Sequence, residues 1–333
     1  MFGRMLGLAL ALFANTLTAA EPLRRYQARE PHMGVDVTIT LYAPSEAVAT
    51  DAVKAAFRRI ADLNKVFSDY DPDSESMRLC AATSVGQPMP ISEDLFVVLT
   101  AARSWSEKTD GAFDVTVGPL VDLWRRSRRT KKLPTPEAVK EAQQRVGYQH
   151  VRLLADPPRA ALDRETMRLD FGAIAKGYAA QEAVKTLTKM GLPRCLVAIA
   201  GDIAAGDAPP DAPGWKIGIA PPNADADPSR YLKLVKACVS TSGDSYQYVE
   251  INGRRYSHIV DSRTGLGLTH RCSVTVVSPS GSTSDALDTA ATILGAERGA
   301  KLIEDTEGAA GLLIFGEERS ETTTSRFKEW LWE

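Results

Sequence analysis

The sequence contains little cysteine and little histidine. Its four cysteines, Cys80, Cys195, Cys238 and Cys272, are far apart, form no C-x-x-C pair and have no histidine directly beside them. This spacing argues against a zinc site and against a redox motif. Cys195, Cys238 and Cys272 lie in apolar runs typical of strands, where buried free thiols are expected. We therefore predict no disulfide, although export from the cytoplasm would permit one.

The chain also lacks an excess of charge of either sign. Its 40 Lys and Arg residues are balanced by 42 Asp and Glu residues. The overall charge therefore indicates neither nucleic acid nor an anionic membrane surface as a partner. One basic cluster occurs at Arg125, Arg126, Arg128, Arg129, Lys131 and Lys132. Runs of this kind are usually solvated, and we interpret this one as a surface loop.

Membrane-spanning hydrophobic runs are missing, and the one notable apolar run stands at the N-terminus. Residues 1–20 carry a single basic residue, Arg4, then an apolar run from Met5 to Ala14, then small residues up to Ala20. This run is shorter than the roughly 20 residues that span a membrane, and its layout is typical of a secretory signal peptide. We expect residues 1–20 to be removed, residues 21–333 to form a single two-lobed domain, and the protein to be exported and periplasmic. An uncleaved N-terminal membrane anchor is the alternative.

The periodicity of apolar residues predicts an α+β fold with mixed and antiparallel sheets. Residues 35–40 alternate with period two, as a strand does, and residues 45–66 have helical spacing. Further helices are expected at 92–105, 136–146, 174–190 and 284–294, the first two with Ser92 and Thr135 as N-caps. Short β-branched runs predict strands at 195–199, 215–220, 232–240, 246–251 and 272–278, with a hairpin turn at Asn252-Gly253.

One candidate for anion binding is the segment from Asp170 to Tyr178. A strand ends at Asp170, a glycine-containing turn follows, and a helix begins near Lys176. Free backbone N–H groups at the start of a helix attract anions, and Lys176 would add a positive charge. An ordinary tight connection would have the same sequence pattern.

A candidate metal site lies in the segment from Ser284 to Ala290. Asp285 and Thr289 are four residues apart on the expected helix, so their oxygens project from one face. A carboxylate and a hydroxyl suit a hard cation such as magnesium, which keeps several waters and contacts phosphate. Alternatively, Asp285 only compensates the dipole of its own helix and Thr289 packs.

His258 is the candidate general base. Among the four histidines, it alone stands among Ser, Asp, Arg and Thr residues, at an expected sheet edge beside Asp261. Its side chain has the pKa that suits proton transfer near neutral pH, although a lone histidine is more often structural. Two polar turns, at 111–120 and 240–244, are either walls of a ligand site or ordinary loops.

These five segments, in this order, resemble those of the FAD:protein FMN transferases, called the ApbE family. The resemblance runs from about Met33 to the C-terminal Trp330-Leu331-Trp332. It implies a two-lobed, T-fold-like α+β architecture with FAD between the lobes. It also implies site residues. The flavin contacts would be Met33 and Tyr70, and the adenosine and pyrophosphate end would be lined by Ala112, Phe113 and Asp114. Further FAD contacts would be Asp170 and Lys176, the magnesium ligands would be the Ala173 carbonyl, Asp285 and Thr289, and the base would be His258.

The implied reaction is magnesium-dependent transfer of FMN from FAD to a threonine or serine hydroxyl of another protein, with release of AMP. The acceptor would carry a Ser/Thr-Gly-x-Thr-type motif and belong to a membrane redox complex or an exported FMN-binding domain. The family often has Gly-Gly in the turn where this chain has Phe171-Gly172, and Asp where it has Gln181. Two alternatives stay open: a magnesium-dependent FAD pyrophosphatase, and an exported FAD-binding protein without turnover.

Overall fold

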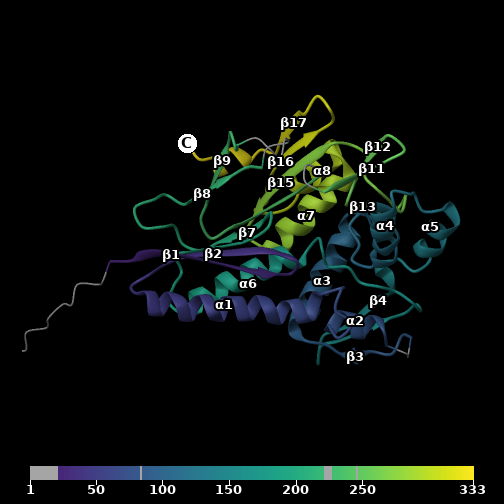
Figure 1. Ribbon diagram of the computed structural model, residues 1–333, viewed down its shortest axis with the longest axis horizontal. Helices are drawn as coiled ribbons and strands as arrows, with labels where there is room; N and C mark the ends of the chain where they lie inside the picture. The colour runs from purple at the N-terminus through teal and green to yellow at the C-terminus, as the bar shows by residue number, and fades with distance from the viewer. Residues whose placement is uncertain (1–21, 83–84, 221–226, 245–246) are drawn as a thin grey trace, which may run out of the picture.

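The computed structural model describes residues 22–82, 85–220, 227–244 and 247–333 (Figure 1). The expected signal peptide, residues 1–20, lies outside these residues. None of the described helices combines the length and the apolar character that crossing a membrane requires.

One large antiparallel sheet forms the centre of the molecule. Its strands, in spatial order, are β1 (Arg24–His32), β2 (Val35–Ala43), β6 (Cys195–Ile199), β7 (Asp202–Ala205), β10 (Cys238–Gly243), β15 (Cys272–Ser278), β16 (Ala310–Phe315) and β17 (Ser320–Thr323). Every neighbouring pair in this order is antiparallel. β15 is buried along its whole length, because both faces of the sheet are covered.

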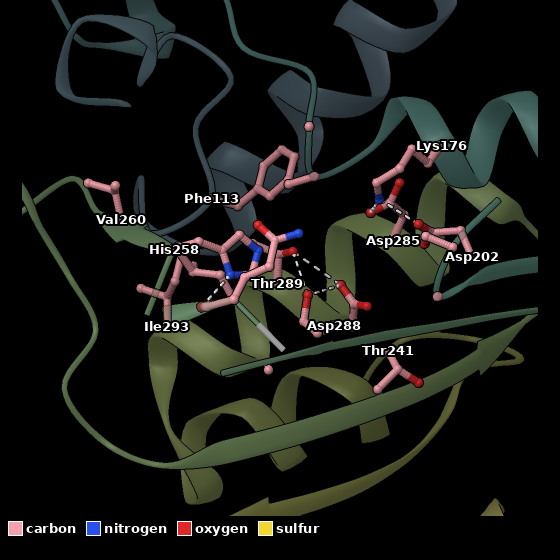
Figure 2. Close-up of a pocket in the computed structure, with 18 of the residues that line it drawn as sticks. Phe113, Lys176, Asp202, Thr241, His258, Val260, Asp285, Asp288, Thr289 and Ile293 are labelled. Carbon is pink, nitrogen blue, oxygen red and sulfur yellow. Dashed lines mark hydrogen bonds and ion pairs between the residues drawn. The ribbon is translucent and has the colours of Figure 1, made fainter. Parts of the chain in front are cut away.

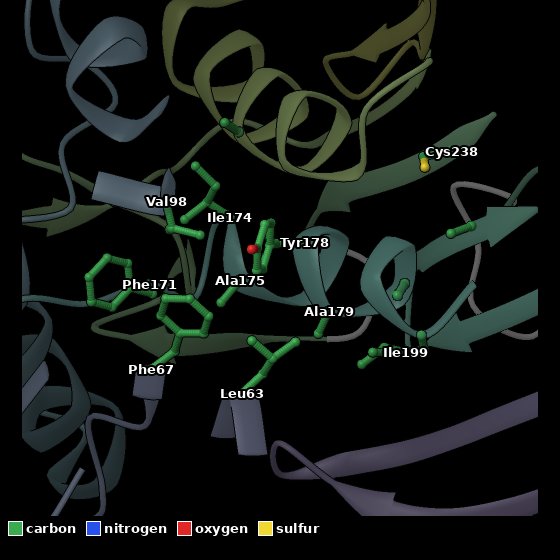
Figure 3. Packing of buried hydrophobic residues seen from close by; sticks show 14 of the residues in the cluster. Leu63, Phe67, Val98, Phe171, Ile174, Ala175, Tyr178, Ala179, Ile199 and Cys238 are labelled. Carbon is green, nitrogen blue, oxygen red and sulfur yellow. The ribbon is translucent and has the colours of Figure 1, made fainter. Parts of the chain in front are cut away.

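Helices cover one face of this sheet: α1 (Glu46–Phe67), α6 (Ala175–Lys189), α7 (Gly281–Leu294) and α8 (Ala296–Glu304). The main core lies between them and the strands, where Val37, Ile39 and Leu41 of β2 are fully buried. Figure 3 shows the aromatic part of this core, in which Phe67 packs against Phe171 at 5.3 Å between ring centroids.

A smaller core covers the opposite face. It is built by the hairpin of β8 (Trp215–Gly218) and β9 (Tyr231–Leu234) and by the 3₁₀ turn η2 (Phe327–Trp330). Trp215 and Phe327 are buried there against Leu312 of β16. The alternation of side chains along β16 therefore serves two cores, with Leu313 in the main core and Leu312 in the smaller one.

A second lobe lies beside the helical face. It contains α2 (Glu75–Cys80), α3 (Glu93–Lys108), α4 (Gly118–Thr130), α5 (Pro136–Gln143), η1 (Tyr148–His150) and a small sheet of β3 (Met89–Pro90), β5 (Arg159–Leu162) and β4 (Val151–Leu154). Two hairpins complete it: β11 (Tyr248–Ile251) with β12 (Arg254–Ser257), and β13 (Val260–Asp261) with β14 (Leu266–Gly267). Trp124 of α4 joins α4 to these hairpins, because its indole N–H donates to the carbonyl of Ser257 at 2.9 Å.

The structure confirms the α+β fold with antiparallel sheets. It also confirms Ser92 and Thr135 as N-caps, since each side chain accepts a hydrogen bond from the backbone N–H three residues on. All four cysteines are free.

Several sequence predictions were wrong. The basic cluster lies mostly in α4, not in a loop. The dense positive charge pointed to a loop, although α4 also has an apolar face, formed by Leu120 and Trp124. The predicted strand at 232–240 is two strands, β9 and β10, and the segment 240–244 is mostly strand rather than turn. α5 ends at Gln143, before the expected end at residue 146. α7 begins at Gly281 with Ser280 as its N-cap, so Asp285 lies in its second turn.

Candidate active site

A cavity of about 720 Å³ opens between the helical face of the main sheet and the second lobe. Its walls come from α4, from the first turn of α6, from α7, from β7 to β10, and from the segment around His258. The volume is within the range of small-molecule sites. Figure 2 shows Phe113 and His258 on one side of this space and Lys176, Asp202 and Asp285 on the other.

The candidate residues line this cavity with one exception. Those that do are Tyr70, Ala112, Phe113, Asp114, Asp170, Ala173, Lys176, His258, Asp285 and Thr289. Met33 does not. It occupies the turn between β1 and β2, where its φ is +51°, and it packs half-buried against the main core. The sequence analysis did not predict β1, because this strand is mostly exposed and polar and shows no apolar face. Met33 was therefore expected before the first strand, whereas it follows β1.

Lys176 is held between two carboxylates. Its Nζ lies 2.5 Å from Asp202 Oδ2 and 3.7 Å from Asp285 Oδ1. Burial opposes its charge, but Asp202 and Asp285 more than offset burial, so the pKa of Lys176 lies above its ordinary value. Lys176 therefore stays protonated at neutral pH.

Asp285 also caps a helix other than its own. Its Oδ2 accepts from the backbone N–H of Gly177 at 2.9 Å, in the first turn of α6, where no side chain of the N-cap residue does so. The carboxylate thus faces a helix N-terminus, a favourable place for an anion. The alternative considered for Asp285 was that it compensates the dipole of its own helix, α7. The carboxylate instead accepts a hydrogen bond at the start of α6.

A hydroxyl group of β10 contacts Asp288, the second carboxylate of α7 at this site. Ser242 Oγ lies 3.0 Å from both Asp288 Oδ1 and Thr289 Oγ1, and Thr289 donates to Asp288 at 3.2 Å. The pKa of Asp288 is raised well above its ordinary value by burial and then by the charges of Asp285 and Asp202. Burial and Asp202 likewise raise the pKa of Asp285.

This group of oxygens fits a hard cation. Among the described residues no three Cys, His, Asp or Glu side chains form a ready-made metal cage. The candidate donors are instead the Asp285 carboxylate, the Thr289 hydroxyl and the backbone carbonyl of Ala173, three residues that line the cavity. Such a set leaves positions for waters and a phosphate oxygen, which is how magnesium is usually held. A divalent cation would also relieve the repulsion between Asp202, Asp285 and Asp288.

His258 is oriented by a backbone carbonyl rather than by Asp261. Its Nδ1 lies 3.3 Å from the carbonyl oxygen of Gln247, which can only accept, so Nδ1 carries the proton and Nε2 keeps a free lone pair. Asp261 is engaged by Arg263 instead, at 2.8 Å. Burial lowers the pKa of His258 to about 4, with smaller contributions from Arg128 and Lys176. The imidazole is therefore neutral at physiological pH and able to accept a proton.

Comparison with known proteins identifies the family. The family model described as ApbE family matches residues 33–313. The FAD:protein FMN transferase of Haemophilus influenzae is 32% identical over 262 residues, which cover 77% of this chain and 76% of the relative. The flavin transferase ApbE from Vibrio cholerae has a solved structure with a TM-score of 0.82 at 30% identity, covering 93% of this chain and 100% of that one.

The chain belongs to the ApbE family. A second solved member, the apo form of the Pseudomonas stutzeri flavinyl transferase ApbE, matches with a TM-score of 0.80 at 30% identity and covers 92% of this chain and 97% of that one. The fold implied by the resemblance is therefore the fold observed.

In this ApbE-family cavity, Tyr70 lies at the edge and makes a cation–π contact with Arg125. The guanidinium of Arg125 lies 4.5 Å from the centre of the Tyr70 ring, and 78% of Tyr70 is exposed. Arg125 also pairs with Asp69 and, at 3.1 Å, with Asp170. Burial and the charge of Asp69 raise the pKa of Asp170. Arg125 and the hydrogen bond from the N–H of Gly172 lower it, but by less. One ring face of Tyr70 is thus covered by Arg125, and the phenol stands where a planar ligand could stack on it.

Asp114 shapes the turn that carries Ala112 and Phe113. Its Oδ1 accepts from the N–H and the hydroxyl of Thr116, and its Oδ2 accepts from the N–H of Tyr148 at 3.0 Å. Burial raises its pKa. Both carboxylate oxygens of Asp114 therefore already accept hydrogen bonds from described residues, and these bonds hold the cavity wall in place.

The sequence analysis missed four kinds of cavity residue. Asp202 pairs with Lys176 across 26 positions, and Arg125 and Arg128 were assigned to a loop. Asp288 was not among the candidate site residues, and Ser242 was considered only as part of a polar turn. The available signal was the helical spacing of Val117, Val121, Trp124, Arg125 and Arg128, which puts them on one face of α4.

Proposed function

We propose that this protein transfers FMN from FAD to a threonine or serine hydroxyl of another protein and releases AMP. The observation that carries the proposal is that a neutral imidazole, His258, and the carboxylate–hydroxyl pair Asp285 and Thr289 face one cavity in a chain of the ApbE family. A base for the acceptor hydroxyl and a site for the pyrophosphate are the two requirements of this reaction.

Different residues of the cavity would contact different parts of FAD. FAD would lie with its pyrophosphate toward Lys176 and the first turn of α6, and with its isoalloxazine on Tyr70. Asp285, Thr289 and the Ala173 carbonyl would hold magnesium, which would supply positive charge at the pyrophosphate end. Lys176 adds a fixed positive charge at the same end, and Asp202 keeps its side chain in place.

His258 is the proton acceptor. Nε2 would take the proton of the acceptor hydroxyl while its oxygen forms a bond to the FMN phosphorus. The bond from that phosphorus to the bridging oxygen breaks, and AMP leaves with the electron pair. Since a free threonine hydroxyl is a weak nucleophile, much of the rate must come from positioning it against the phosphorus. The Gln247 carbonyl contributes by holding His258 in the tautomer that has a free Nε2.

The acceptor would be a protein with a Ser/Thr-Gly-x-Thr-type motif, a subunit of a membrane redox complex or an exported FMN-binding domain. We further propose that residues 1–20 act as a signal peptide and that the enzyme works in the periplasm. Mass spectrometry of the N-terminus of protein recovered from a periplasmic extract tests this: a chain beginning near Glu21 supports cleavage, and an intact Met1 in the membrane fraction contradicts it.

The experiment for the activity is to incubate residues 21–333 with FAD, an acceptor domain carrying the motif, and either magnesium or EDTA. The acceptor is then weighed by intact mass spectrometry. Acceptor heavier by one FMN, only with magnesium, supports the proposal. AMP release with unmodified acceptor would identify an FAD pyrophosphatase, and bound FAD without AMP would identify a carrier.

A further inference from the structure

The C-terminal half of α4 forms a line of positive charge that leads out of the cavity. Arg125 and Arg128 line the cavity itself. Arg129 follows on the same side of the helix, and Lys131 and Lys132 continue just beyond its end at Thr130. Arg129, Lys131 and Lys132 are exposed. We call Arg128, Arg129, Lys131 and Lys132 the basic track.

The basic track is not neutralised by the rest of the described chain. Arg125, one turn earlier, pairs with Asp69 and Asp170. The four residues of the track, by contrast, make no side-chain hydrogen bond or ion pair with any residue that the structure describes. Exposed cations next to one another repel, so a cluster without carboxylates carries a field that attracts acidic partners.

The inner end of the track lies close to the base. Arg128 and His258 line the same cavity, and α4 packs against β13, the strand that follows His258 (Figure 1). The positive charge of Arg128 contributes, after burial, to the low pKa of His258. A ligand that follows the track inward therefore arrives at the imidazole.

FAD does not account for the outer part of this track. Arg129, Lys131 and Lys132 do not line the cavity, so they lie outside the space in which FAD would be held. The second substrate is the one that must approach His258 from solvent. A cationic approach to a site favours association with an anionic partner and loses that advantage in high salt.

We propose that the basic track is the docking surface for the acceptor protein, and that it selects acceptors with acidic residues beside the modified hydroxyl. This inference rests on the proposed FMN transfer and specifies its second substrate. Arg128 would contact the acidic residue nearest the hydroxyl, and the outer three residues would steer the rest of the segment.

The test compares two synthetic peptides that carry the same Ser-Gly-Ala-Thr core, one flanked by glutamates and one by lysines. The variant is Arg129→Gln, Lys131→Gln and Lys132→Gln together, because glutamine removes charge without placing a carboxylate at a helix C-terminus. The matched control is Lys54→Gln, Arg58→Gln and Lys189→Gln, three exposed cations of α1 and α6 that do not line the cavity. FAD affinity, melting temperature and FMN transfer are measured for each.

With the wild-type chain, the acidic peptide should be modified at least about tenfold more efficiently than the basic one, and the difference should shrink with added salt. The track variant should raise KM for the acidic peptide about tenfold with unchanged FAD affinity and melting temperature, and the control variant should not. Equal use of both peptides, or an equal effect of the control variant, would overturn the docking surface. If neither peptide gains FMN, the transferase proposal itself fails, and the inference with it.

Discussion

The carboxylate of Asp285 in α7 accepts a hydrogen bond from the backbone N–H of Gly177 in α6, at 2.9 Å. The two helices can approach this closely because glycines face each other there: a methyl group on Gly177 would lie 2.1 Å from the carbonyl oxygen of Gly281. Asp285, a proposed metal ligand, is thus fixed by the same contact that joins the two helices. The site depends on this contact for its geometry.

Gly177→Ala should disturb both packing and the site. The added methyl group would overlap the backbone of α7, and overpacking of this kind costs about 1–3 kcal/mol of the free energy of unfolding. Denaturant unfolding should show this loss, and transfer activity should fall more than stability alone explains, because Asp285 shifts. Lys54→Ala, at an exposed position of α1, is the control. Unchanged stability in Gly177→Ala would contradict the close helix contact.

Asp285→Asn should separate the two roles of this residue. The amide oxygen can still accept from Gly177, so the fold should survive, but the negative charge for the metal is lost. We expect turnover to fall about a thousandfold or more, with weaker magnesium binding, as judged by isothermal titration calorimetry. Asp285→Ala should in addition lose the cap, and so be less stable and bind FAD more weakly. Full transfer activity in the Asn variant would remove Asp285 from the metal site.

Magnesium affinity should depend on pH. Because burial and Asp202 raise the pKa of Asp285, protons compete with the metal for this carboxylate at pH values above those of an ordinary aspartate. Binding should be weaker at pH 6 than at pH 8 and should release protons to the buffer. Calorimetry in buffers of different ionisation enthalpy measures both effects. Affinity that is constant between these pH values would count against Asp285 as a ligand.

His258 should remain neutral far below the usual range for histidine. Its pKa is lowered to about 4, whereas an unperturbed histidine titrates near about 6.5. The folded state therefore binds fewer protons than the unfolded state between these values. The stability that neutral His258 contributes is complete above pH 6.5 and is lost as pH falls toward 4.

The direct measurement for His258 is an NMR titration of the imidazole signals, assigned by comparison with His258→Asn, which is practical because the chain has only four histidines. A midpoint near 6.5 would contradict the half-buried, neutral base. His258→Ala should still bind FAD but lose FMN transfer. Full activity in this variant would exclude His258 as the base.

Arg125 should support both Tyr70 and the fold. Arg125→Met would leave the carboxylates of Asp69 and Asp170 without their cation and would remove the group that covers the Tyr70 ring. Since Arg125 is partly exposed, we expect a loss of about 1–3 kcal/mol rather than the full cost of a buried unpaired charge. FAD affinity, followed by flavin fluorescence, should fall as well. Arg126→Met, at an exposed position of α4, should change neither quantity.

The sequence predicted what depends on local spacing. The N-caps at Ser92 and Thr135 and the strand predicted at 35–40 follow from residue type and period alone. They were confirmed, although the strand continues to Ala43. Residue chemistry and spacing singled out Lys176, the pair Asp285 and Thr289, and His258, and family resemblance added Met33, Tyr70 and the stretch 112–114. The structure gathers these residues in one cavity, apart from Met33. Their roles remain predictions until they are tested.

What the sequence could not predict depends on contacts between distant segments. The pairing of Asp202 with Lys176 has no local signal, because it joins β7 to α6 across the sheet. His258 was expected beside Asp261, but its partner is the Gln247 carbonyl. This contact depends on how two loops meet, which local sequence does not show. The assignment of Arg125 and Arg128 to a loop was a wrong reading of charge, although Pro119 and the pair Leu120 and Trp124 offered a helical signal.

The most direct test of FMN transfer is a single-turnover reaction. FAD in less than stoichiometric amount is bound to the enzyme with magnesium, acceptor is added, and AMP and FMN-modified acceptor are measured in the same samples over time. The proposed transfer predicts that both products appear at one rate and in a ratio of one to one, with no free FMN. Free FMN appearing in step with AMP, while the acceptor stays unmodified, would contradict it.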